Sequence, residues 1–170
     1  MTKTKPITRL TPYLLLALPY AYALFVYGKL PAHLAVHFAT STNPNAYLSK
    51  PLFLITGLLF GCLLQAFMDW TLQGSDRITN ASFRHVFHWL LPLVWSGLSL
   101  AILWRNLFTH FPILASSLYT VGISLLIISN YLPKQVQVGR QPLPRWTAYT
   151  LTLISLLILL WASVLLLTGK

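Results

Sequence analysis

The chain has 170 residues, of which 56% are hydrophobic and only 8% are charged. A soluble domain carries roughly 25% charged residues, so this composition excludes a soluble globular protein. The net charge of +10 would suit a nucleic-acid binder, but the basic residues are scattered at the ends of apolar runs and form no basic cluster. We therefore expect no direct contact with nucleic acid.

Charged residues divide the chain into five apolar intervals, each long enough for one membrane-spanning helix. A helix of about 20 apolar residues crosses about 30 Å of hydrocarbon. The sequence therefore predicts an all-α, polytopic integral membrane helix bundle with five transmembrane helices, near residues 10–28, 51–70, 86–104, 113–132 and 147–168. We expect residues 1–72 to form an N-terminal two-helix unit with an outer loop, and residues 73–170 to form a C-terminal three-helix unit of the same compact bundle.

The basic residues also indicate an orientation. Eight Lys and Arg residues flank the connections on one side of the predicted spans and four flank the other side, and the richer side is normally cytoplasmic. This predicts a bacterial cytoplasmic membrane protein with a cytoplasmic N-terminus and an outer segment at 29–50. A cleaved signal sequence ending at "AYA" (21–23) is the alternative, but the apolar run continues through Val26, which favours an uncleaved first helix.

The first two predicted helices carry features that suit close packing. Pro19 lies inside the first span, where a proline removes a backbone hydrogen bond and favours a bend. In the second span, Gly57, Gly61, Gln65 and Asp69 follow at intervals of four and so share one helix face. We expect that face to meet protein, either within the chain or in a homodimer through Gly57 and Gly61.

Few side chains could carry catalysis. The chain has two acidic residues, a single cysteine, Cys62, and no recognisable nucleophile, zinc or paired-carboxylate motif. His33 and His37 would share a metal only if their segment were helical, and two histidines make an incomplete site. We therefore expect a non-enzymatic protein without cofactor or bound metal; a histidine-dependent metalloenzyme is the weakest alternative.

Several polar residues lie near the predicted helix ends. Asp69 needs a cation or water, and Arg77 or Arg84 could supply the cation. His85 and His88 either approach Asp69 or extend toward lipid headgroups, as polar side chains at helix ends commonly do. Asn130 either bonds across helices or caps its own helix before Pro133.

Two motifs resemble known families. "LPAHLAVHFATSTNPNAYLSKP" resembles a bacterial membrane domain of uncharacterised function, with a Leu-Pro start, a His-Phe pair and a closing Ser-Lys. "SNYLPKQ" resembles the Asn-Tyr-Leu-Pro-Lys motif of the SdpI-type immunity proteins, in which both elements occur in this order. The residues that carry the two resemblances here are Leu30, Pro31, His37, Phe38, Ser49 and Lys50, and Asn130 to Lys134.

The chain departs from the family pattern at several positions. Ala39 stands where an Asn is usual, Thr42 stands where a Gly is usual, and five spans replace the usual six. A Gly-x-Arg-Thr-Pro-Trp segment is reduced to Gly139, Arg140 and Trp146. These differences bear on the topology of the outer end and on any cytoplasmic partner.

The resemblance implies immunity to, or sensing of, a membrane-active peptide toxin or bacteriocin, with the peptide at the outer face. It also implies a cytoplasmic repressor or other protein at the Pro133 to Arg145 loop. The ligand-binding residues that we expect are Pro31, His37, Phe38, Lys50, Asp69, Asn130, Lys134 and Arg140. A small transporter or transporter subunit is the alternative, because the second span combines glycines with polar side chains.

Overall fold

The computed structural model describes residues 6–38, 43–73 and 78–168. The described chain forms helices, two strands and a short 3-10 turn, in the order α1 (Pro6–Phe25), η1 (Tyr27–Lys29), β1 (His33–Phe38), β2 (Pro44–Ser49), α2 (Lys50–Gln73), α3 (Ala81–Leu107), α4 (Ile113–Ser129) and α5 (Arg145–Thr168). Three residues named above lie outside the described residues, Ala39, Thr42 and Arg77, and so do three of the basic residues counted for the orientation, Lys3, Lys5 and Lys170.

The five predicted spans correspond to the five helices, and the helical bundle is confirmed. Three helices, α2, α3 and α5, are long and apolar enough to cross a membrane. The apolar part of α1 (10–25) and α4 (113–129) are shorter. α3 begins earlier than predicted because Asn80 caps it: its side-chain Oδ1 accepts a hydrogen bond from the Phe83 amide at 2.9 Å.

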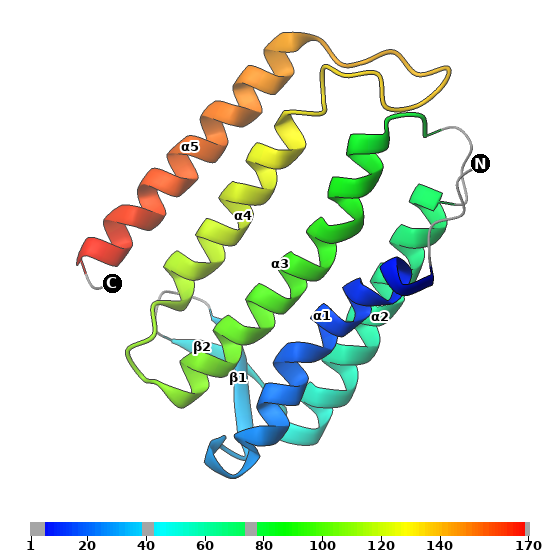
Figure 1. Cartoon of the computed structure of the whole chain (residues 1–170). Coiled ribbons are helices and arrows are strands. Elements are labelled where there is room, and N and C mark those ends of the chain that lie inside the picture. Colours follow the sequence, from blue (N-terminus) through cyan, green and yellow to red (C-terminus); the bar gives the residue numbers. More distant parts are fainter. Residues whose placement is uncertain (1–5, 39–42, 74–77, 169–170) are drawn as a thin grey trace.

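The helices run alternately up and down, which gives the bundle two distinct ends (Figure 1). The "hairpin end" holds the end of α1, both strands, the start of α2, the α3–α4 turn and the end of α5. The "loop end" holds the start of α1, the start of α3 and the 130–144 connection. Lys134, Arg140 and Arg145 thus share one end and Lys29, Lys50 and Arg105 share the other, as predicted from their alternation.

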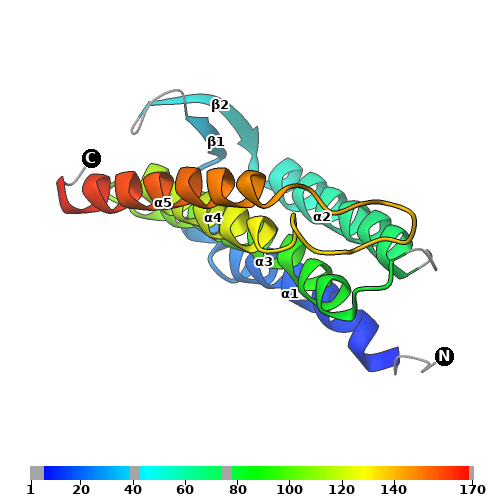
Figure 2. The ribbon, with the colours of Figure 1, turned by 90° about the horizontal axis from the view of Figure 1, so that it is seen from above.

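α1, α2 and α3 pack together, and α4 and α5 form a pair that joins them through α3 (Figure 2). α4 and α5 lie close because Gly122 carries no side chain: a Cβ there would come within 2.8 Å of Leu159. Their polar side chains also meet, Tyr119 with Ser163 at 2.7 Å and Thr152 with Ser129 at 3.0 Å. The outer side of α5 exposes a series of large apolar residues, which is typical of a lipid-facing helix.

The segment predicted as an outer loop is mostly a β-hairpin, so that expectation was wrong in its secondary structure. β1 and β2 pair antiparallel, with Leu34 opposite Leu48 and Ala35 opposite Tyr47. Leu34 and Ala35 are buried while His33 and His37 are exposed, so the middle of β1 packs on the core and the two flanking histidines do not. A two-stranded hairpin is marginal alone, so packing against the helices stabilises it.

A hydrophobic cluster joins the hairpin to α1, α2 and α3. Its fully or nearly fully buried members are Tyr20, Ala23, Val26, Leu30, Leu34, Phe53 and Leu103. Burying Leu34 alone contributes roughly 1.5–3 kcal/mol relative to leaving it exposed. This cluster fixes the hairpin against the end of the bundle.

Candidate functional site

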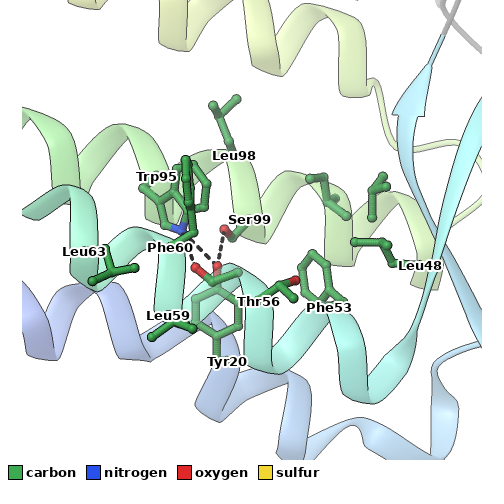
Figure 3. Close-up of a pocket in the computed structure, with 13 residues that line it drawn as sticks. Tyr20, Leu48, Phe53, Thr56, Leu59, Phe60, Leu63, Trp95, Leu98 and Ser99 are labelled. Atoms are coloured by element: carbon green, nitrogen blue, oxygen red, sulfur yellow. Dashed lines mark hydrogen bonds between the residues drawn. The ribbon is translucent and has the colours of Figure 1, made fainter.

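An apolar groove of about 510 Å³ lies between α2, α3 and the hairpin (Figure 3). Val36 and Leu48, one from each strand, line its hairpin end. The exposed fractions of Leu59, Phe60 and Leu63 are 56%, 53% and 59%, so the α2 wall lies on the outer side of the bundle. The remaining lining residues are Tyr20, Phe53, Thr56, Gly57, Trp95, Leu98, Ser99 and Ile102. The volume is within the range of small-ligand sites.

The floor of the groove contains one compact polar network. The Trp95 indole Nε1 donates to the Tyr20 hydroxyl at 2.9 Å and to the Gly57 carbonyl at 3.1 Å. The Tyr20 hydroxyl also lies 3.1 Å from Ser99 Oγ (Figure 3). Because these buried groups satisfy one another, the floor offers apolar surface without an uncompensated polar group. The groove therefore suits an apolar side chain or chain segment.

The stripe on α2 faces protein, as predicted, and the two glycines make the groove floor possible. A Cβ at Gly57 would lie 2.6 Å from the Tyr20 hydroxyl oxygen, and one at Gly61 would lie 2.7 Å from Trp95 Nε1. Tyr20 and Trp95 belong to the same chain, so the intramolecular use of the stripe is confirmed. A homodimer through these glycines stays a prediction.

The hairpin is attached to α3 through Asn106. Its Oδ1 accepts from the Ala35 amide at 2.8 Å, and its Nδ2 donates to the Ala35 carbonyl at 3.0 Å. Asn106 thus satisfies both backbone groups of one β1 residue, as a neighbouring strand would do. Asn106 Nδ2 also donates to the Ile102 carbonyl at 2.8 Å, and Ile102 lines the groove. The hairpin and the groove wall are therefore held together.

Lys50 closes the hairpin at its other end. Its ammonium donates to the carbonyls of Tyr27 and Leu30, at 3.1 and 3.0 Å, and lies 4.6 Å from the centre of the Tyr27 ring. Its amide donates to the Ala32 carbonyl at 3.2 Å. Lys50, predicted to contact a ligand, thus links α2 to the end of α1, and its head is committed to backbone carbonyls.

The other predicted residues of this segment lie on the outer side of the hairpin. Pro31 and His37 are exposed, and His37 Nδ1 lies 2.6 Å from Asn45 Oδ1 on the opposite strand. Phe38 is half-buried, and its ring centre lies 6.0 Å from the Arg105 guanidinium. The segment of His33 is a strand, so the helical spacing that a two-histidine metal site required does not form. Within the described ranges, no three His, Cys, Asp or Glu side chains gather to hold a metal.

Asp69 lies in a second polar cluster, farther toward the loop end. Its Oδ1 lies 2.7 Å from His88 Nδ1 and accepts from Gln65 Nε2 at 3.0 Å, and its Oδ2 accepts from the Tyr13 hydroxyl at 3.1 Å. The expectation that Arg84 supplies the cation was wrong, because the Arg84 guanidinium donates to the Ile78 carbonyl. Side chains from α1, α2 and α3 thus meet on one carboxylate.

The predicted residues of the 130–145 connection lie at the loop end, away from the groove. Asn130 is exposed and forms the C-cap position of α4, so it does not bond across helices. Its Oδ1 accepts from Lys134 Nζ at 3.1 Å, and that ammonium lies 5.0 Å from the Tyr131 ring centre. Arg140 is exposed after a turn, and its backbone carbonyl accepts a hydrogen bond from Gln135 Nε2. The eight predicted site residues therefore do not form one site.

The groove residues that define the site were not among the residues predicted from the sequence. Tyr20 comes from α1 and Trp95 and Ser99 come from α3, far away in the chain, and Asn106 lies in the last turn of α3. A usable signal was present for Tyr20, Trp95 and Ser99: each places a hydrogen-bonding group inside a long apolar run, where such groups normally bind a protein partner. Asn106 lies between two predicted spans and carries no such signal. Which partner each one finds was not readable from that signal.

The fold and the groove define a helical bundle of membrane type with a small β-hairpin at one end. Residues 14–60 match the family model described as a domain of unknown function, DUF1648, which covers less than half of the chain. The match includes the larger part of α1, the hairpin and the first half of α2, and thus contains the whole of the first motif. The comparisons with curated proteins and with solved structures found no match.

Proposed function

We propose that this protein is a non-enzymatic bacterial membrane protein that binds a membrane-active peptide, and so confers immunity to it or senses it. The observation that carries the proposal is the apolar groove of about 510 Å³ between α2, α3 and the hairpin. Its α2 wall is exposed on the outer side of the bundle, where a peptide dissolved in the bilayer would meet it. The resemblance of the Leu30–Lys50 and Asn130–Lys134 motifs to the SdpI-type immunity proteins points to the same function.

Binding would remove the peptide from the bilayer without covalent chemistry. A groove lined by aromatic and aliphatic side chains takes its affinity from buried apolar area. The rigid floor made by Tyr20, Trp95 and Gly57 favours a fixed shape over an adaptable one, because its polar groups are already paired. We expect the peptide to present one or a few large apolar side chains to this floor.

The test combines a gene deletion with a groove-filling variant. A deletion strain challenged with a panel of membrane-active peptides should become sensitive to at least one, and the wild-type gene should restore resistance. Thr56→Trp, which places a large ring in the groove, should fail to restore it. Thr150→Trp on α5 is the matched control, because both hydroxyls bond to their own helix one turn earlier, Thr56 to Leu52 and Thr150 to Trp146. Equal sensitivity of the deletion and its parent to every peptide would remove the proposal.

A small transporter is the second candidate, and the Asp69 cluster is the observation that favours it. A carboxylate and an imidazole that meet inside a helix bundle are a common arrangement in ion- and proton-coupled carriers. Asp69→Asn should then abolish substrate uptake in proteoliposomes while leaving the bundle folded. Uptake at the wild-type rate by that variant would reject this candidate.

A further inference from the structure

The outer edge of β2 is available for pairing at Tyr47. In an antiparallel pair, directly opposed residues alternate between those that exchange backbone hydrogen bonds and those whose N–H and C=O groups point away from each other. Ala35 is opposite Tyr47, and both backbone groups of Ala35 bind Asn106 instead of β2. The Ala35–Tyr47 pair is therefore of the second kind, and the Tyr47 N–H and C=O point outward from the sheet.

The bond between Lys50 and Ala32 supports this assignment independently. The Lys50 amide donates to the Ala32 carbonyl at 3.2 Å, so that pair exchanges hydrogen bonds. The pairs alternate from there along the hairpin. His33 and Ser49 exchange no backbone hydrogen bonds, Leu34 and Leu48 exchange them, and Ala35 and Tyr47 again do not. In the part of the chain that the structure describes, no backbone bond outside the hairpin reaches Tyr47.

The free edge lies directly beside the groove. Leu48 follows Tyr47 in β2 and lines the groove, and its cross-strand neighbour Leu34 is fully buried. A third strand placed next to β2 would put the residue opposite Leu48 on the same face of the sheet. One extended segment can therefore satisfy the Tyr47 backbone and place an apolar side chain toward the groove.

Charge at the hairpin end selects among the possible occupants. This end carries the cationic side chains of Lys29, Lys50 and Arg105. The one carboxylate side chain among the described residues, Asp69, is in the cluster toward the loop end. A second copy of the chain pairing through β2 would bring the same basic residues together, which is unfavourable. An acidic partner is complementary.

We propose that an extended, acidic peptide segment binds as a third strand on β2, pairing with the Tyr47 backbone and directing an apolar side chain into the groove. This inference rests on the proposed function, for which it names the binding mode and the charge of the ligand. Backbone pairing provides affinity that is independent of sequence, while the groove and the basic residues provide selectivity.

The test uses purified full-length protein in nanodiscs and synthetic hexapeptide probes with a fluorescent label. One probe alternates valine with glutamate, and a matched probe has lysine in place of glutamate. Two further versions of the acidic probe are N-methylated at alternate amides, so that one of them lacks the N–H groups on the pairing edge. Binding is followed by fluorescence anisotropy. The protein variants are Tyr47→Pro, which removes the outward N–H, and Tyr47→Thr, which keeps it.

Proline is tolerated in a strand where its N–H would have pointed outward, so Tyr47→Pro should preserve the β1–β2 pairing. The acidic probe should bind wild type and Tyr47→Thr alike and bind Tyr47→Pro at least about tenfold more weakly. The lysine probe should bind more weakly than the acidic one. If Tyr47→Pro shifts the unfolding midpoint, the N-methylated probes on wild-type protein make the same comparison, and one of them should lose binding.

Any of three results would overturn the third-strand pairing. The acidic probe could bind Tyr47→Pro and Tyr47→Thr equally, both methylated probes could keep their binding, or the acidic probe could show no saturable binding at all. Tighter binding of the lysine probe would overturn the assigned charge. The two proposals fail separately. A Tyr47→Pro strain that keeps full peptide resistance, while the deletion strain is sensitive, rejects this binding mode and leaves the proposed function intact.

Discussion

Asn106 and Ala35, 71 positions apart in the chain, form a two-point contact in which one side-chain amide satisfies both backbone groups of a strand residue. The contact takes the place of a strand on the inner edge of β1. It therefore determines which edge of the hairpin is closed and which remains open.

Asn106→Ala should loosen the hairpin without unfolding the bundle. The Ala35 amide and carbonyl lose their partners, which costs about 1–3 kcal/mol for each group that stays buried. Hydrogen exchange measured by mass spectrometry should show faster exchange in the peptide containing Ala35 and unchanged exchange in α5. Asn45→Ala, on the exposed turn side of the hairpin, is the control and should leave the Ala35 amide protected. Unchanged protection in Asn106→Ala would contradict the anchoring role.

Gly57→Ala and Gly61→Ala should both destabilise the protein. Their added methyl groups would lie 2.6 Å from the Tyr20 hydroxyl and 2.7 Å from the Trp95 indole nitrogen, so the groove floor must shift. Overpacking of this kind costs typically about 1–3 kcal/mol, which should lower the unfolding midpoint measured in detergent. Gly97→Ala on α3 is the matched control, because a Cβ there meets nothing within 4 Å. It should be neutral or stabilising, since alanine is the better helix former.

Asp69 and His88 should show energetic coupling in a double-mutant cycle. The cycle combines Asp69→Asn with His88→Phe and measures unfolding in detergent. Residues in direct contact through a charged hydrogen bond typically couple by about 0.5–3 kcal/mol. The same cycle with His85→Phe is the control, because His85 lies one turn away from His88 and is exposed. Equal coupling for the two histidines would show that the 2.7 Å contact has no energetic weight.

Cysteine labelling should establish which end of the bundle faces outward. In a Cys62→Ala background, Asn43→Cys at the hairpin end should react with an impermeant maleimide in intact cells. Val138→Cys, which is exposed at the loop end, should react only after lysis. The reverse pattern would mean that the excess of basic residues does not set the orientation, and that the groove opens nearer the cytoplasmic leaflet.

The sequence by itself determined the helices, because exclusion of charge from hydrocarbon is a property of each interval taken alone. The spacing of charges placed α2 near residues 51–70, and the structure has Lys50–Gln73. The four-residue spacing of Gly57, Gly61, Gln65 and Asp69 likewise fixed which face of α2 is buried, since periodicity along a helix is local.

Only the tertiary structure decided which groups meet across the bundle. Tyr20 forms hydrogen bonds with Trp95 and Ser99, and Asp69 contacts His88 in place of Arg84. Several side chains were chemically suitable as partners, and the packing of the helices decides which of them lies close enough. The hairpin could not be predicted from the sequence for the same reason. Its strands are short and partly polar, so neither predicts a sheet alone, and their stability depends on Leu34 entering the core and on Asn106 binding the Ala35 backbone.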